Sequence, residues 1–359
     1  MKRTLGVLSA IVTGVLVLAA WPQRSLEAQA PGAGRGAAAA EARAKQEAAE
    51  KAVPQLQVTE EILPLVIPDH TIGETEGVSL NSKGHLFVYS RTGKGGSARG
   101  GTAAELFEFD QNYKFIKQWA PDSYAASFAH AVRVDKYDNV WFVDEGSSMI
   151  VKMDPNGVVK MVLGRKPEAI DYLERFIERG EKDTNRYPDG GVGTFNRPTD
   201  VAWASQDNIY ISDGYGNSRF VKILKDGTWV KAIGTHGPGP NQFSTPHGIA
   251  SDGQLVYVAD RGNNRIQVYD TNMEFKATYG SIGAPWSVQV TSKYIYSGDG
   301  TGKIYRLDRS TGKLLGWAQT SLGQGQTGCL IHSLHAVSDT VLIKGACSEW
   351  NVEKITFKN

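Results

Sequence analysis

The sequence predicts an all-β protein, a six-bladed β-propeller whose repeated units fill residues 76–359. One pattern recurs along the chain: a turn, a short apolar strand, a polar turn and a second apolar strand that ends in Asp. Two further short strands follow each copy, so a unit has four strands and roughly forty to fifty residues, which describes a propeller blade. The 40 glycines, 14 tyrosines and 8 tryptophans also suit many short strands joined by tight turns.

Three copies of the repeat are clear, one is looser and two are degenerate; they begin at His130, Pro198 and Pro246, at Glu76, and at Pro285 and Leu334. The last unit ends with its third strand, so we expect the segment Leu56 to Ile67 to supply the missing outer strand and close the ring. Residues 168–179 show helical spacing and residues 186–193 are rich in turn formers. They predict a helical insertion over about 168–193, between blades 2 and 3.

The first 30 residues predict a signal peptide. Lys2 and Arg3 precede an apolar stretch over 5–20, and residues 28–30 fit the small-x-small cleavage pattern. A retained single-span anchor is the alternative, although the apolar run is short for one. We expect cleavage, which leaves no membrane span in the mature chain and places the protein in the periplasm or outside the cell.

The Ala- and Glu-rich residues 31–55 predict a flexible or loosely helical spacer outside the fold, because they offer no apolar face to bury. The propeller then occupies residues 56–359. With 39 Lys and Arg against 38 Asp and Glu, the chain has no charge excess that would attract nucleic acid or an anionic membrane. We expect a monomer.

The chain contains two cysteines, Cys329 and Cys347. In an exported protein such a pair favours a disulfide, and their spacing matches no thiolate metal pattern. Antiparallel pairing in the last unit brings the two strand ends together, which makes the bond geometrically plausible.

Equivalent positions on the innermost strands lie at one height around the channel. Aligning the units gives this series: Glu76, His130, Thr199, His247, Trp286 and His335. Histidine falls on alternate blades, about 120° apart in a six-fold ring, so three imidazoles can point at one spot on the axis. Three nitrogen ligands with open positions are typical of catalytic zinc. The sequence therefore predicts a metal site at His130, His247 and His335 for zinc or another divalent transition metal such as iron, cobalt or copper.

Three further residues should lie at the same mouth of the channel. Arg91 and Arg261 follow the second strands of blades 1 and 4, and Tyr215 follows that of blade 3. Arginine suits bidentate capture of a carboxylate, and a tyrosine hydroxyl beside a cation can transfer protons. Both residue types also make ordinary turn hydrogen bonds at blade rims, which is the alternative interpretation.

Two stretches give the chain a family resemblance. Residues 213–219 (Asp-Gly-Tyr-Gly-Asn-Ser-Arg) follow Pro-Thr-Asp-Val at 198–201, and Gln-Phe-Ser-Thr-Pro-His at 242–247 precedes Ala-Asp-Arg-Gly-Asn-Asn-Arg-Ile-Gln at 259–267. These motifs resemble the peptidyl-α-hydroxyglycine α-amidating lyases, six-bladed propellers of the NHL-repeat type. The resemblance covers about residues 76–345 and is strongest from blade 2 through blade 4.

The resemblance implies a function and a set of site residues. The family's metal histidines fall on His130, His247 and His335, its arginines on Arg91 and Arg261, and its tyrosine on Tyr215. The implied activity is carbon–nitrogen lyase chemistry on a small peptide or amide with a free carboxylate, giving an amide and glyoxylate. In these implied roles the metal binds the substrate hydroxyl, Tyr215 relays its proton, and an arginine holds the carboxylate.

The chain departs from the family pattern at several positions. The family's two disulfides are replaced by Asn196 and Gly216, and by Tyr257 and Val268. Ser333 stands where the family has a methionine, and Ala336 where it has an acidic calcium ligand, so a structural calcium ion is doubtful. Ser333 and Ala336 lie on either side of His335, so this ligand is the least secure of the three, and His332 is the nearest alternative.

Two other functions stay open at this point. A propeller hydrolase, acting on a lactone or an ester, could use the same three-histidine site, and the fold does not choose between the two reactions. A non-enzymatic NHL scaffold that binds a protein or glycan in the cell envelope would need no metal.

Overall fold

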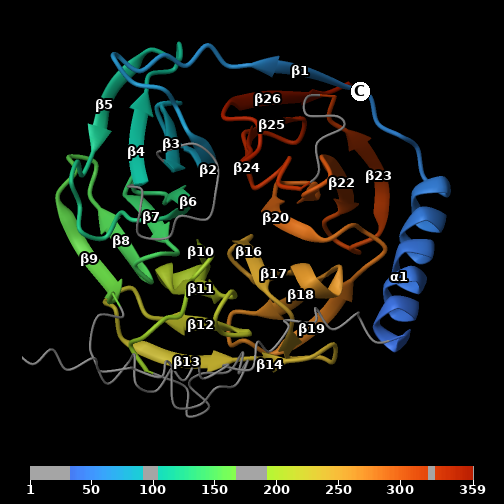
Figure 1. Ribbon diagram of the computed structural model, residues 1–359. Coiled ribbons are helices and arrows are strands. Elements are labelled where there is room, and N and C mark those ends of the chain that lie inside the picture. Colours follow the sequence, from blue (N-terminus) through green and yellow to red (C-terminus); the bar gives the residue numbers. More distant parts are fainter. Residues whose placement is uncertain (1–32, 92–103, 167–191, 322–327, 359) are drawn as a thin grey trace, which may run out of the picture. The chain divides into compact units, whose positions relative to one another are not determined.

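The computed structural model describes residues 33–91, 104–166, 192–321 and 328–358. The predicted signal peptide and nearly all of the predicted helical insertion at 168–193 lie outside the described residues. Six four-stranded antiparallel sheets form the blades of a β-propeller, which confirms the predicted fold (Figure 1). Residues 41–359 belong to one compact unit.

Within each blade, the strands are given in order from the channel outward. Blade 1 contains β2 (Glu74–Leu80), β3 (Leu86–Arg91), β4 (Ala104–Phe109) and β5 (Phe115–Trp119); blade 2 contains β6 (Ala129–Val134), β7 (Val140–Asp144), β8 (Met149–Met153) and β9 (Val159–Gly164). Blade 3 contains β10 (Asp200–Trp203), β11 (Ile209–Asp213), β12 (Arg219–Ile223) and β13 (Trp229–Ile233); blade 4 contains β16 (Pro246–Ser251), β17 (Leu255–Asp260), β18 (Arg265–Asp270) and β19 (Phe275–Tyr279).

Blades 5 and 6 complete the set. Blade 5 contains β20 (Pro285–Val290), β21 (Tyr294–Asp299), β22 (Lys303–Asp308) and β23 (Leu314–Gln319); blade 6 contains β24 (Ser333–Ala336), β25 (Val341–Gly345), β26 (Val352–Phe357) and β1 (Val58–Ile62). Outside the blades are the helix α1 (Ala33–Lys51), two short 3₁₀ turns, η1 (Ser205–Asp207) and η2 (Arg261–Asn263), and a small parallel pair, β14 (Thr235–His236) with β15 (Gln242–Phe243).

The ring closes by joining the two ends of the propeller in one sheet. β1 pairs antiparallel with β26, with Val58 opposite Phe357 and Ile62 opposite Glu353. The N-terminal strand therefore supplies the outer strand that the last blade lacks, as the sequence predicts. An otherwise exposed sheet edge is thereby paired.

Apolar side chains fill the spaces between neighbouring blades. Tyr89 of blade 1 and Phe142 of blade 2 lie with ring centroids 5.2 Å apart, and Phe220 of blade 3 and Tyr269 of blade 4 lie 4.8 Å apart. Each of the six buried clusters draws its residues mainly from two adjacent blades. Because these cores lie between blades, the inner strands are held rigidly and their polar side chains can face the channel.

The segment predicted as a spacer outside the fold is partly docked onto it. Gln46 donates a hydrogen bond to Tyr305 Oη at 2.7 Å, and Lys303 pairs with Glu50 at 2.7 Å. These contacts tie the end of α1 to β22 of blade 5. Along the part of the chain that the structure describes, no helix has the length and apolar character needed to cross a membrane.

Candidate metal centre

Three buried histidines come together where alternate inner strands begin. One nitrogen from each of His130, His247 and His332 lies within 4.8 Å of the others. The ring centroids are 4.6 Å apart for His130 and His247, 4.6 Å for His130 and His332, and 4.9 Å for His247 and His332. Each side chain comes from a different blade, so the propeller rather than any local segment assembles the group.

A break in strand pairing turns the side chains of His130 and His247 toward the channel. In blade 2, Ala129 and Ala131 pair with the adjacent residues of β7, and His130 between them is left over as a β-bulge. In blade 4, the ladder between β16 and β17 is interrupted directly after Pro246, and His247 lies in that interruption. A bulge re-aims a side chain away from the ordinary alternation of a strand.

The third histidine is His332, and the prediction of His335 needs correction. The N–H of His332 donates to the carbonyl of Gly345 at 2.9 Å, one residue before Ser333 pairs with the same Gly345. His335 lies three residues further, inside the regular ladder of β24, with Nδ1 3.4 Å from Ser79 Oγ. Three strand residues displace it by about 10 Å along the channel.

A hydrogen bond from Nδ1 to a backbone carbonyl orients each of the three rings. The Nδ1 atom of each histidine lies 2.5 to 2.7 Å from the backbone carbonyl at the equivalent position of the following blade: His130 on Thr199, His247 on Trp286 and His332 on Glu76. A carbonyl only accepts, so each Nδ1 must carry the hydrogen. In a neutral ring this leaves Nε2 as an acceptor, and such an outer hydrogen bond is typical of metal-binding histidine.

The group has the chemistry that a divalent transition metal requires. Burial is the main cause that lowers the pKa of each ring, well below 6.5 for His130 and His247 and to about 3 for His332. All three rings are therefore neutral near pH 7. The Nε2 atom of His130 is buried and has no hydrogen-bond partner, an arrangement that costs free energy unless a ligand occupies it. Three neutral imidazoles thus form a possible three-histidine metal site.

Buried aspartates hold the loops that lead into two of these histidines. Asp144 ends β7 and accepts the N–H groups of Ser127 and Phe128, just before His130. Asp260 ends β17 and accepts the N–H of Ser244, just before His247. In blades 2 and 4, the Asp that closes the repeat therefore has a direct role in placing the histidine of its own blade.

Blade 6 lacks that Asp and has a disulfide instead. Cys329 and Cys347 are bonded, with their Cα atoms 5.5 Å apart. The bond joins the segment before His332 to the segment after β25, which confirms the predicted pairing and replaces the aspartate as the anchor of this loop.

Tyr215 and Arg261, both predicted from sequence, lie against the histidines. The Tyr215 hydroxyl is 3.1 Å from His247 Nε2, and Nη1 of Arg261 donates to the same hydroxyl at 3.2 Å. The Arg261 guanidinium also lies 4.3 Å from the ring centroid of Trp286. Burial raises the pKa of Tyr215 above its usual 10, and the neighbouring Arg261 opposes that rise.

Arg91 lies on the other side of the group and is surrounded by carboxylates. Its guanidinium pairs with Glu76 at 3.0 Å, Glu74 at 3.2 Å and Glu145 at 3.6 Å. Glu76 also contacts His332, with Oε2 3.1 Å from Nε2. Burial raises the pKa of Glu76 to about 8, so near pH 7 it can donate its proton to this nitrogen. Sequence analysis gave these glutamates no role, although Glu76 occupies the bulge position of blade 1 and was visible in the aligned series.

Arg197 is a further residue that the sequence prediction missed. Its Nε donates to Glu145 at 2.8 Å, and its guanidinium carbon lies 4.6 Å from the ring centroid of Tyr215. It follows Asn196 directly in the loop before β10, so its place beside the site depends on that loop and not on the repeat.

Comparison with known proteins agrees with the propeller fold. The NHL repeat family model matches residues 243–269. The chain is 27% identical over 248 residues to a probable peptidyl-α-hydroxyglycine α-amidating lyase from Caenorhabditis elegans, covering 65% of this chain and 64% of that protein. It is 30% identical over 225 residues to peptidylglycine α-amidating monooxygenase from Rattus norvegicus, covering 56% of this chain and 21% of that protein. This chain is thus a β-propeller that contains a match to the NHL repeat and is similar in sequence to amidating lyases.

The match spans just under two thirds of the worm lyase and about a fifth of the rat protein. Human NHL repeat-containing protein 3 is also similar, 28% identical with coverage of 56% of this chain and 54% of that protein. Among solved structures, a streptogramin B lyase (TM-score 0.52, 14% identity, 84% of this chain and 98% of that one) has the same fold. So has a gluconolactonase from Xanthomonas campestris (TM-score 0.55, 15% identity, 80% and 87%). At such identities these structures support the propeller fold alone.

The residues at the centre of the NHL-repeat propeller do not fit the calcium ion that the family resemblance implies. Arg133 of β6 forms a bidentate pair with Asp200, with distances of 2.9 and 2.7 Å. Its Nη1 donates to the carbonyls of Val78 at 3.3 Å and Leu334 at 3.1 Å. The guanidinium thus joins the inner strands of blades 1, 2, 3 and 6 and occupies the oxygen atoms that a calcium ion would need.

Proposed function

We propose that this protein is a metal-dependent carbon–nitrogen lyase that cleaves an α-hydroxyglycine-like C-terminus into an amide and glyoxylate. The observation that carries the proposal is the convergence of three neutral imidazoles with Tyr215 and Arg261 in contact beside them. Similarity to proteins named as amidating lyases supports the choice of reaction. The proposed ligands are His130, His247 and His332, and zinc is the first choice of metal because all three donors are imidazoles.

The metal would act as a Lewis acid that lowers the pKa of the substrate hydroxyl. The three histidines would hold it through Nε2, because each Nδ1 is committed to a backbone carbonyl. The Tyr215 hydroxyl lies 3.1 Å from His247 Nε2, so a substrate bound at the histidines would be within reach of this phenol.

Tyr215 is placed to relay the proton of the reaction. As the C–N bond breaks, the carbon–oxygen bond of the carbinolamide becomes the carbonyl of glyoxylate, the hydroxyl loses its proton and the amide nitrogen gains one. Burial keeps the phenol protonated, so Tyr215 can donate to the leaving nitrogen while it accepts the hydroxyl proton. No net proton is gained or lost.

Arg261 is the better anchor for the substrate carboxylate. Arg91 already pairs with Glu74, Glu76 and Glu145, so a carboxylate there would have to displace existing ion pairs. No ion pair is found for Arg261 among the residues that the structure describes; its contacts are the Tyr215 hydroxyl and two aromatic rings. A guanidinium 4.3 Å from the Trp286 ring centroid, with no ion pair among the described residues, can bind a carboxylate through two N–H groups.

The proposed substrates are small peptides or amides that carry a free carboxylate, and the proposed place of action is the periplasm or the exterior of the cell. The disulfide of blade 6 is compatible with an oxidising compartment. We propose that the protein acts there as a monomer.

The direct test is release of glyoxylate from benzoyl-α-hydroxyglycine by purified protein supplied with zinc, and in parallel with iron, cobalt or copper. We expect metal-dependent release that a chelator abolishes. Absence of glyoxylate with every metal and at several pH values would contradict the lyase proposal. Turnover of lactones or aryl esters in the same panel, without glyoxylate release, would favour a hydrolase, and a protein that binds no metal would favour a scaffold.

A further inference from the structure

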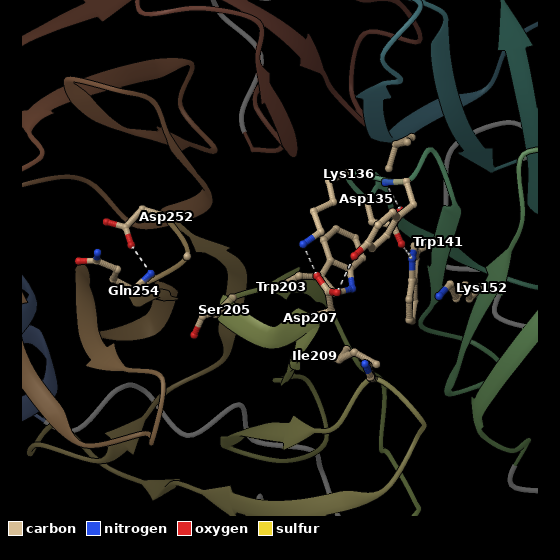
Figure 2. Close-up of a pocket in the computed structure, with 15 residues that line it drawn as sticks. Asp135, Lys136, Trp141, Lys152, Trp203, Ser205, Asp207, Ile209, Asp252 and Gln254 are labelled. Atoms are coloured by element: carbon tan, nitrogen blue, oxygen red, sulfur yellow. Dashed lines mark hydrogen bonds and ion pairs between the residues drawn. The ribbon is translucent and has the colours of Figure 1, made fainter.

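A cavity lies at the opposite ends of the inner strands from the histidines. It has a volume of about 470 Å³ and is formed by blades 2, 3 and 4 (Figure 2). Its walls come from the segments that follow the inner strands: residues 134–137 after β6, 203–207 at the end of β10, and 252–254 after β16. Val134 is four residues beyond His130, so about 13 Å of extended strand separates the two sites.

Aromatic rings form one wall of the cavity and are fixed in place. Tyr137 is 57% exposed, yet its hydroxyl donates to Asp207 at 2.7 Å across the boundary between blades 2 and 3. Trp203 packs against Trp141 with ring centroids 5.3 Å apart. An exposed ring that is held by a hydrogen bond loses little freedom when it binds a ligand, which favours affinity.

The cavity also contains a polar donor without an acceptor. Nε1 of Trp203 is buried and makes no hydrogen bond. Buried N–H groups are almost always paired, so a donor on a cavity wall that has no protein acceptor is one that a water molecule or a ligand can satisfy. The neighbouring Trp141 Nε1, by contrast, already donates to Asp135 at 3.0 Å.

The charges that remain available in the cavity are positive. The lining carboxylates all have protein partners: Asp135 accepts from Trp141, Asp207 pairs with Lys136 at 2.6 Å and Asp252 pairs with Arg309 at 3.0 Å. For Lys152 and Lys225, no carboxylate partner is found among the described residues. Lys152 lies 5.2 Å from the Trp141 ring centroid, and Figure 2 shows the two side chains next to each other.

We propose that this cavity binds an acidic sugar, with a uronic acid as the chemical class. The sugar ring would pack against Tyr137 and Trp203, an oxygen of the ring or a hydroxyl would accept from Trp203 Nε1, and the carboxylate would lie near Lys152 and Lys225. A cavity of this size, mainly apolar with a few fixed polar groups, is typical of small-ligand sites. The inference does not depend on the proposed lyase activity, because no residue is shared.

The proposal is tested by isothermal titration of the full chain with glucuronic acid, trigalacturonate and uncharged cellotriose. We expect binding of an acidic sugar with a dissociation constant of about 1 mM or tighter and at least tenfold weaker binding of cellotriose. Preference for trigalacturonate would indicate that the ligand is part of an acidic polysaccharide. Equal binding of glucuronic acid would indicate a free sugar acid, and both results support the acidic-sugar site. No heat with either acid, or equal binding of cellotriose, would overturn it.

Two variants assign the binding to this cavity. Lys225→Gln removes a surface charge and Trp203→Phe removes the unpaired N–H while keeping a ring; each should weaken binding about fivefold or more. Lys160→Gln, in β9 and outside the cavity, is the matched control and should bind as the parent does. Unchanged affinity in both Lys225→Gln and Trp203→Phe would overturn the assignment, and glyoxylate release by these variants should equal that of the parent.

Discussion

The even-numbered and odd-numbered blades use one structural position for two purposes. Blades 2, 4 and 6 place a histidine there, while blades 1, 3 and 5 place Glu76, Thr199 and Trp286, whose backbone carbonyls accept the Nδ1–H of the preceding blade's histidine. Every imidazole is therefore fixed by a neighbouring blade that itself contributes no histidine to the group. The fold therefore sets the position of these residues along the channel and the orientation of their side chains. Which side chain stands there on alternate blades decides the chemistry.

The largest catalytic effect is expected at Tyr215, whose hydroxyl contacts the histidine of blade 4. Tyr215→Phe should lower kcat by about 10²- to 10⁴-fold, because a proton relay is lost while the three histidines are untouched. Steady-state rates of glyoxylate release, with metal content measured in parallel, check this. A variant that keeps its metal and loses less than about threefold in kcat would remove Tyr215 from the mechanism.

The largest effect on stability is expected at the buried ion pair of Arg133 and Asp200, which joins the inner strands next to the histidines. Arg133→Met should lower the free energy of unfolding by about 3 to 5 kcal/mol, because Asp200 would remain buried without its partner. The double variant Arg133→Met/Asp200→Asn should recover part of that loss in the same denaturant titration. The melting temperature of the parent should not change with calcium or EGTA, and a calcium-dependent shift would show that the arginine does not replace the ion.

Substrate binding should be sensitive to Arg261. Arg261→Lys should raise KM by about tenfold or more with a smaller change in kcat, because lysine cannot make two parallel hydrogen bonds to a carboxylate. A substrate analogue in which the carboxylate is amidated serves as the control and should be equally poor with both enzymes. Loss of kcat at unchanged KM would point to a role in chemistry instead of binding.

The smallest effect should come from an odd-blade side chain. Thr199→Val removes hydrogen bonds of the hydroxyl with Ser212 and Pro246 but keeps the carbonyl that holds His130. Unfolding free energy should fall by about 1 to 2 kcal/mol, while metal content and kcat should stay within a factor of two of the parent. A metal-free Thr199→Val protein would show that the side chain, and not the carbonyl, matters at odd blades.

Much of this arrangement could be predicted because the propeller is a repeat. Once the units were aligned, the six blades, the closing strand and the level of His130 and His247 followed from sequence periodicity. Blade 6 is degenerate, and it offers two histidines three residues apart. Which of them reaches the axis depends on where pairing with Gly345 begins, and periodicity does not define that register when the repeat itself is weak.

Other contacts depend on distances between blades. The carbonyl acceptors of the three Nδ1 atoms, the carboxylates around Arg91 and the reach of Arg133 across the inner strands join residues up to 256 positions apart in the chain. They arise from packing, so no local pattern announces them. The docking of Glu50 onto Lys303 was missed for the same reason, since the helix has no apolar face and its contacts are polar.

The central claim is that His332, and not His335, completes the group with His130 and His247. Metal analysis of the purified full chain and of the pair His332→Ala and His335→Ala tests it most directly. We predict a stoichiometric transition metal in the parent and in His335→Ala, and its loss in His332→Ala with the fold retained by circular dichroism. Metal kept in His332→Ala and lost in His335→Ala, or no metal in the parent after reconstitution, would contradict the account.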